Sequence, residues 1–218
     1  MNDRDQAKPV AQAVYQEVQR NRLFADELNE MVMKELRQRQ HDGLKTSALL
    51  FGRDMANLAY GAAKLGVQVV LASHDSALQD CTNLRILPVP AVQGAVPVMQ
   101  EAPFDVIVGQ FVLHTVPYEA AKARLKQLLG LLKIGGKLYL SAYGLHSTLG
   151  DHYPDSGKLV KERFAAVPQA IATLYDVHGE ICLYSERNLI SLMFELGASV
   201  LHSATGALGN VRAVAVRI

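Results

Sequence analysis

Three polar side chains capable of acid–base or hydrogen-bonding chemistry lie at the ends of two apolar runs of the sequence. Gln110 ends the run 104–110, His114 follows it closely, and Tyr143 ends the run 137–143. Because the ordinary pKa of histidine lies near neutrality, His114 is a candidate general base. The same ring could instead cap the helix that follows it or pack against Tyr143. The residues alone leave these alternatives open. Those that involve both His114 and Tyr143 require the two runs to end at one edge of a sheet.

The elements that would position these residues are a strand, a helix and a second strand. The segment FDVIVGQ (104–110) is a short apolar run, typical of a buried parallel strand. Four leucines between positions 125 and 132 recur at helical spacing. Gly135 and Gly136 are expected to end that helix, because a left-handed cap favours glycine. The apolar, β-favouring segment KLYLSAY (137–143) follows, so the whole stretch predicts a βαβ crossover.

The pieces FDVI, VLHTV and LKIGGKLYL of this stretch resemble the fourth and fifth strands of class I S-adenosylmethionine-dependent methyltransferases. The resemblance implies an α/β fold with a doubly wound, mostly parallel sheet of seven strands, helices on both faces and an antiparallel last strand. It also implies S-adenosylmethionine as cofactor. Gln110 and Phe111 would then contact the cofactor, and His114 and Tyr143, the candidate catalytic residues, would face the methyl group and the substrate.

The first cofactor motif of that family is an acid on the first strand followed by a GxGxG turn. Glycine is needed there because the backbone passes close to the ligand. The resemblance places the acid at Leu50 and the three glycines at Gly52, Asp54 and Ala56, so only Gly52 is retained. Asp54 could pair with the ammonium of the methionyl group, or it could cap the helix that begins at this point.

Two further acids of the family pattern are also replaced. The acid that ends the second strand and accepts the ribose hydroxyls corresponds to Ser73, with Asp75 two positions later as a possible substitute. The position at the end of the third strand falls on Pro90, which lacks an N–H group, and its neighbour Ala91 is assigned to the same part of the cofactor site. Asp75 could equally lie in a solvated loop.

The rest of the chain fits the same architecture. Residues 1–42 contain no glycine and are expected to form an N-terminal helical cap. Val10, Val14 and Val18 share one helical face, and a second face is expected from Leu28, Met31, Val32, Glu35 and Leu36. The domain proper is expected to span 43–218, with a helical insert at about 144–180. The remaining expected elements are strands at 46–52, 67–72, 84–89, 198–203 and 211–218, and helices at 54–66, 158–174 and 187–196.

The composition excludes several classes of protein. The net charge of +1 gives no basis for nucleic acid or an anionic membrane surface as partner, and no apolar stretch approaches the length of a membrane span. Two isolated cysteines, Cys81 and Cys182, are expected to be buried thiols in a reducing compartment, so a cytoplasmic location is expected. His146, Asp151 and His152 match no tight metal-ligand spacing, and no metal is assigned.

Two functional hypotheses follow. The first is a methyltransferase that acts on a small molecule and has a divergent cofactor pocket. The second is a methyltransferase-like binding or regulatory protein that has lost the cofactor and serves a protein partner. The missing acids and glycines favour the second, whereas direct methyl transfer requires little beyond orientation and so stays open to such a divergent chain. The sequence leaves the substrate and the oligomeric state open.

Overall fold

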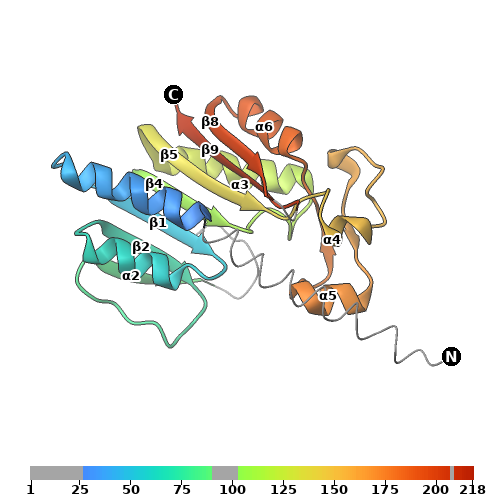
Figure 1. Cartoon of the computed structure of the whole chain (residues 1–218), viewed down its shortest axis with the longest axis horizontal. Helices are drawn as coiled ribbons and strands as arrows, with labels where there is room; N and C mark the ends of the chain where they lie inside the picture. Colours follow the sequence, from blue (N-terminus) through green and yellow to red (C-terminus); the bar gives the residue numbers. More distant parts are fainter. Residues whose placement is uncertain (1–26, 90–102, 207–208) are drawn as a thin grey trace.

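A computed structural model of the chain describes residues 27–89, 103–206 and 209–218 (Figure 1). Its centre is a sheet of seven strands in the order β3-β2-β1-β4-β5-β9-β8. β1 to β5 are parallel, and β9 is antiparallel to both of its neighbours. The expected doubly wound sheet with an antiparallel last strand is therefore confirmed. The strands are β1 (Ser47–Gly52), β2 (Gln68–Ser73), β3 (Leu84–Pro88), β4 (Phe104–Gln110), β5 (Leu132–Ala142), β8 (Ala198–Thr205) and β9 (Val211–Arg217).

Helices cover both faces of the sheet because successive strand residues point to opposite sides. In β1, Leu49 packs with α3 (Tyr118–Leu131) and α6 (Glu186–Glu195), whereas Leu50 packs with α2 (Ala56–Lys64) and the helix of residues 27–41. Figure 1 shows these two helical layers on either side of the strands. Within the described part of the chain, every helix is too short or too polar to span a membrane.

The helix of residues 27–41 confirms one face of the expected N-terminal helices. Leu28, Val32 and Leu36 recur every four residues, and all three are fully buried against the sheet. The expected face of Val10, Val14 and Val18 lies outside the described residues. The boundary of the cap at residue 42 stays a prediction.

The segment between β5 and α6, which we call the insert (residues 144–185), differs from the expected long helix at 158–174. Pro168 cannot donate a backbone hydrogen bond and disfavours helical geometry in the residue before it, so a new helix begins only after it. The insert instead contains short elements, some of them in a two-stranded sheet. They are α4 (Thr148–Asp151), η1 (Val160–Glu162), β6 (Ala165–Ala166), α5 (Gln169–Tyr175) and β7 (Glu180–Ile181).

Two further expectations are corrected, and one is confirmed. α3 ends at Leu131, because Leu132 is already extended, so Gly135 and Gly136 do not end the helix. They lie within β5, between Leu132 and Lys137, where its pairing with β4 shifts register. Cys81 is exposed, and only Cys182 of the two thiols is buried. α6 begins as expected, with Ser185 in a capping box.

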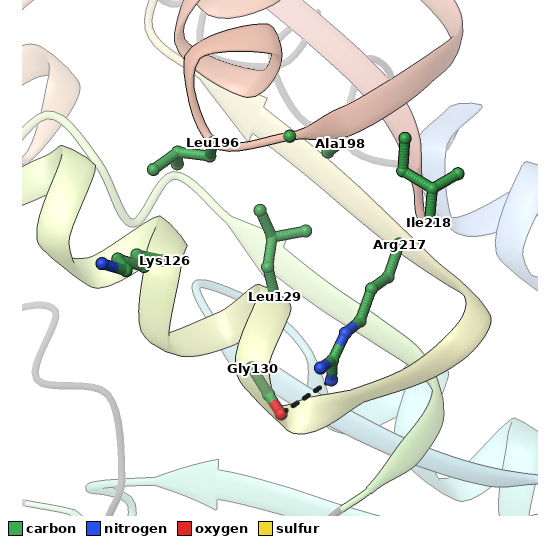
Figure 2. Close-up of a pocket in the computed structure, with 8 residues that line it drawn as sticks. Lys126, Leu129, Gly130, Leu196, Ala198, Arg217 and Ile218 are labelled. Carbon is green, nitrogen blue, oxygen red and sulfur yellow. Dashed lines mark hydrogen bonds between the residues drawn. The ribbon is translucent and has the colours of Figure 1, made fainter.

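A cavity of about 200 Å³ lies at the amino edge of the parallel strands, between the ends of α3 and α6 (Figure 2). Lys126 and Arg217 are its charged side chains. Arg217 already donates hydrogen bonds to the carbonyl oxygens of Gly130, at 3.0 Å, and of Leu132. The guanidinium thus secures the end of α3 to the last strand.

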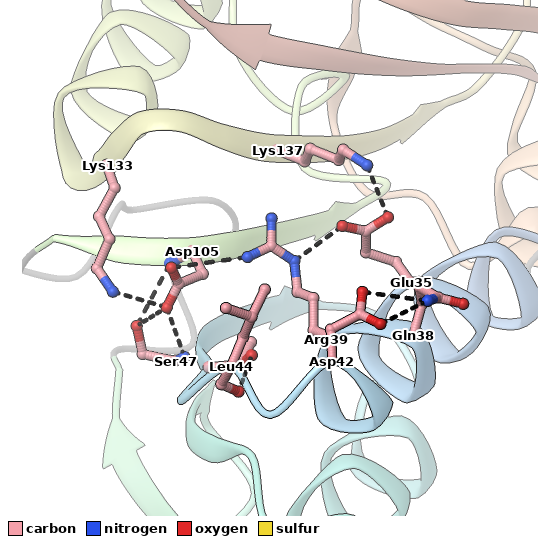
Figure 3. Close-up of polar contacts among 10 residues, drawn as sticks. Glu35, Gln38, Arg39, Asp42, Leu44, Ser47, Asp105, Lys133 and Lys137 are labelled. Atoms are coloured by element: carbon pink, nitrogen blue, oxygen red, sulfur yellow. Dashed lines mark hydrogen bonds and ion pairs between the residues drawn. The ribbon is translucent and has the colours of Figure 1, made fainter.

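The same amino edge carries a network of ion pairs that joins the N-terminal helix to the sheet (Figure 3). Arg39 of the helix pairs with Asp105, and Glu35 pairs with Lys137. Asp105 accepts hydrogen bonds from the backbone N–H and hydroxyl of Ser47, at 2.8 and 2.9 Å, and from Lys133, at 2.7 Å. Burial alone would raise the pKa of the Asp105 carboxyl, but these hydrogen bonds outweigh it and lower that pKa. Asp105, the acid of the FDVI segment, therefore has a structural role.

Candidate functional site

The turn between β1 and α2 has a retained glycine for a clear steric reason. Gly52 has φ +107°, and a Cβ atom there would lie 2.1 Å from the carbonyl oxygen of Gln110. The next amide, that of Arg53, donates to the same oxygen at 3.2 Å. Only glycine fits this position, because the carboxyl ends of β1 and β4 meet there.

Asp54 does not cap α2, contrary to one of the two expectations for it. Its backbone is left-handed, with φ +56°, and the helix begins after Met55 without a side-chain cap. Asp54 itself is exposed at the turn. The position of the family acid, Leu50, is fully buried in the core. The described turn therefore offers the exposed Asp54 carboxylate to a ligand, whereas the Arg53 amide is already bonded to Gln110.

Ser73 and Asp75 hydrogen-bond within their own loop at the end of β2. The hydroxyl of Ser73 accepts the amide of Asp75 at 3.1 Å, and the carboxylate of Asp75 accepts the amide of Ala77 at 2.9 Å. These bonds form a compact turn of the kind that Asp and Ser favour. Both side chains lie at the expected edge of the sheet. Pro90 and Ala91 lie outside the described residues.

Gln110 ends β4, and Phe111 follows it directly. Gln110 is 1% exposed, and its Oε1 atom has no hydrogen-bond partner in the described structure. Phe111 has φ +52°, and its amide donates to the carbonyl and to the hydroxyl of Ser141 on β5, at 3.0 and 3.3 Å. Sequence reasoning missed Ser141, because a serine inside an apolar strand gives no separate signal. A buried acceptor without a partner costs free energy, which makes Gln110 a candidate ligand contact.

His114 and Tyr143 are brought together in an aromatic cluster. The Tyr143 ring stacks on Phe111 with 4.6 Å between centroids, and the His114 ring meets it edge-on at 4.7 Å. Tyr175, from the end of α5, contributes a further edge-on contact at 6.2 Å. All four rings are buried. Of the alternatives for His114, packing against Tyr143 is thus confirmed. Capping of the following helix is not, because α3 begins after Pro117 without a side-chain cap, and the catalytic role stays a prediction.

The electrostatics of the cluster keep both candidate catalytic groups uncharged. Burial, helped by the positive charges of Arg53 and Arg124, lowers the pKa of His114 to about 3. Burial also raises the pKa of the Tyr143 hydroxyl. The Nδ1 atom of His114 has no hydrogen-bond partner in the described part of the chain. A histidine with so low a pKa is a weak base, so at neutral pH His114 offers a hydrogen-bond acceptor.

Arg53 connects the turn after β1 to the insert. Its guanidinium donates to the carbonyl oxygens of Tyr175, at 3.1 Å, and Asp176, at 2.8 Å, and it lies 3.3 Å from the Asp176 carboxylate. The Tyr143 hydroxyl donates to the same Tyr175 oxygen at 3.3 Å. Sequence reasoning missed Tyr175 and Asp176, which are more than 120 residues away from Arg53 in the chain. Among the described residues, no group of three His, Cys, Asp or Glu side chains could hold a metal ion.

Comparisons with known proteins give the fold. No protein-family model matches the sequence, and no curated protein is similar enough in sequence to match. The solved structures with similar folds include a methyltransferase from Methanosarcina mazei, with TM-score 0.56 and 16% identity over 80% of this chain and 93% of that one. A 1,6-didemethyltoxoflavin-N1-methyltransferase from Burkholderia thailandensis, solved with 1,6-didemethyltoxoflavin and S-adenosylhomocysteine, has TM-score 0.57 and 14% identity over 100% and 91%.

A third similar structure is the magnesium protoporphyrin IX methyltransferase from Synechocystis PCC 6803 with bound S-adenosylmethionine. Its TM-score is 0.56, with 15% identity over 90% of this chain and 81% of that one. At these identities the likeness concerns the fold. The chain has the Rossmann-like fold of class I methyltransferases.

Proposed function

We propose that the protein is an S-adenosylmethionine-dependent methyltransferase that acts on a small molecule through a divergent cofactor pocket. The observation that carries the proposal is the side chain of Gln110. Its Oε1 atom is a buried acceptor without a hydrogen-bond partner in the described structure, and it belongs to the residue that ends β4 at the carboxyl edge of the sheet. Open parallel sheets bind ligands at this edge.

The residues present fit the polar end of such a cofactor. S-adenosylmethionine supplies an electrophilic methyl group and carries an ammonium group that can donate hydrogen bonds. The acceptor of Gln110 and the exposed carboxylate of Asp54 suit that ammonium. Ser73 and Asp75 lie at the adjoining edge and would reach a ribose only by giving up hydrogen bonds in their own loop.

Direct methyl transfer requires a nucleophile held in line, and it can proceed without a dedicated acid or base. The uncharged His114 and Tyr143 suit this role, since His114 can accept a hydrogen bond and orient a substrate donor. The similar structures from Burkholderia thailandensis and Synechocystis act on small molecules according to their names, which supports a substrate of this class.

A second candidate function is a binding or regulatory protein without cofactor. It is favoured by Leu50, which replaces the family acid and is fully buried in the core, and by Asp75, whose carboxylate is occupied by its own loop. Such a protein would use a protein partner in place of a substrate.

Isothermal titration with S-adenosylmethionine and S-adenosylhomocysteine distinguishes the two candidates. We expect the wild type to bind both, and Gln110→Leu to bind at least about tenfold more weakly, because a buried hydrogen bond to a charged donor is lost. Gln127→Leu, at an exposed position on α3, is the matched control and should bind like the wild type. An absence of binding at about 1 mM ligand would reject the methyltransferase in favour of the second candidate.

A further inference from the structure

The base of the insert is fixed to the sheet by main-chain hydrogen bonds. The amide of Leu145 donates to the Tyr184 carbonyl at 2.8 Å, and the amide of Tyr184 donates to the Tyr143 carbonyl at 3.1 Å. The amide of Cys182 donates to the His114 carbonyl at 2.8 Å. These bonds extend the carboxyl edge of β5 and involve buried residues, so the base of the insert is part of the core.

The far end of the insert is attached through side chains, some apolar and some polar. Ile171, Tyr175 and Val177 are buried and pack in one cluster with Phe111 and Tyr143. The last carbonyls of a helix have no acceptor role within it. At the end of α5, the Arg53 guanidinium donates hydrogen bonds to the carbonyl oxygens of both Tyr175 and Asp176. A planar guanidinium presents several donors in a fixed fork, so one side chain can hold both carbonyls and the nearby Asp176 carboxylate. The Tyr143 hydroxyl adds one more bond to Tyr175.

Arg53 is also next to Gly52, in the turn that would meet the cofactor. The contacts of α5 therefore lie across the carboxyl ends of β1, β4 and β5, where Gln110 and His114 have their unpaired acceptors. Figure 1 shows α4 and α5 beyond the arrowheads of these strands. The insert is thus attached by main-chain hydrogen bonds at its base. At α5 it is attached by buried apolar packing together with the polar contacts of Arg53, whose side chain is 32% exposed.

We propose that Arg53 is a positioning residue that acts as a latch: it holds the α5 end of the insert over the carboxyl edge of the sheet and so controls ligand access to Gln110 and His114. Loss of the latch loosens α5, which then keeps only its apolar packing, while the base of the insert stays in place. The control of access rests on the proposed function, whereas the latch itself does not.

Hydrogen–deuterium exchange of the ligand-free protein tests the latch. In Arg53→Ala, the α5 amides of Ala172 and Val177, which bond within the α5 region, should exchange about tenfold faster than in the wild type, because charge-assisted hydrogen bonds are lost. The base amides of Cys182 and Tyr184 should exchange at unchanged rates. Arg37→Ala, at an exposed arginine of the N-terminal helix, should leave both regions unchanged.

Arg53→Lys keeps the charge but loses the fork, and should give intermediate exchange in α5. Unchanged exchange of α5 in Arg53→Ala would overturn the latch. Equal acceleration of α5 and of the insert base would also overturn it, because Arg53 would then support the whole region and not one end.

Binding of S-adenosylhomocysteine tests the control of access. If the insert must open before the ligand enters, Arg53→Ala should bind faster and more tightly, since more of the protein is in the competent state. Weaker binding would overturn this part, because it would mean that Arg53 contacts the ligand. Faster exchange of α5 with no ligand binding to either protein would leave the latch standing and reject the proposed function.

Discussion

Removal of the Asp105 carboxylate should destabilise the protein by an amount that its contacts allow us to estimate. The side chain is 13% exposed and accepts two hydrogen bonds from Ser47. A hydrogen bond to a charged group contributes about 1.5–3 kcal/mol to stability, whereas a half-exposed ion pair such as that with Lys133 contributes about 0–1 kcal/mol. We therefore expect Asp105→Ala to lower the free energy of unfolding by at least about 3 kcal/mol, the lower bound for the two hydrogen bonds to Ser47.

The conservative variants separate the two contributions. Asp105→Asn retains one oxygen for the Ser47 amide and loses the charge, so a loss of about 1–2 kcal/mol is expected. Lys133→Ala should cost less than about 1 kcal/mol. Urea-induced unfolding, followed by circular dichroism, measures all three values. If Asp105→Ala costs no more than Lys133→Ala, the hydrogen bonds to Ser47 do not stabilise the junction of β1 and β4, and the reasoning is refuted.

The pH dependence gives an independent check on the same residue. Although burial opposes it, the hydrogen bonds from Lys133 and Ser47 place the pKa of folded Asp105 below its ordinary value of 3.8. Stability from a lowered carboxyl pKa is complete above the unfolded value and is lost as the pH falls through the folded one. The stability difference between the wild type and Asp105→Asn should therefore narrow below about pH 3.8.

Two further predictions concern the site. Gly52→Ala should lower the free energy of unfolding by about 3 kcal/mol or more, since its Cβ would lie 2.1 Å from the Gln110 oxygen. Gly43→Ala, at a position with positive φ and open space around it, should lower it by only about 1–2 kcal/mol. Equal losses in urea unfolding would contradict the steric argument. Because burial lowers the pKa of His114 to about 3 from 6.5, only the unfolded chain binds a proton between these values, so stability falls as the pH falls below 6.5. The wild type should lose about 2 kcal/mol more than His114→Phe between pH 7.5 and 5, and equal losses would show that folded His114 titrates normally.

Much of the sheet could be predicted because its strands are short, apolar and separated by turn residues. The buried runs of β1 and β4 are local signals, and each gave the right element. The end of α3 was wrong for a specific reason. Leu132 continues the helical spacing of leucines and is fully buried, but it is buried as part of β5, so periodicity could not distinguish the two conformations.

The insert and the latch could not be predicted, because their contacts are not local. Arg163 is buried and donates to Lys158 and Leu183 carbonyls and to the Asn188 side chain, and these bonds fix the irregular course of the insert. The role of Arg53 depends in the same way on residues far along the chain. A charged residue in a turn has the same local sequence signal whether it is solvated, binds a ligand or holds another segment.

Leu50 and Gln110 favour different functions: Leu50 stands where the family has an acid, and Gln110 has an unpaired Oε1 atom. Leu50 is fully buried among apolar side chains, so an aspartate restored there would be a buried charge without a partner, and it would destabilise the fold before it could bind a ligand. Gly52 does not discriminate, because the oxygen of Gln110 requires glycine with or without a ligand. The unpaired Oε1 of Gln110 costs about 1–3 kcal/mol, which leucine would avoid, so its presence in the core favours a ligand that supplies the missing donor.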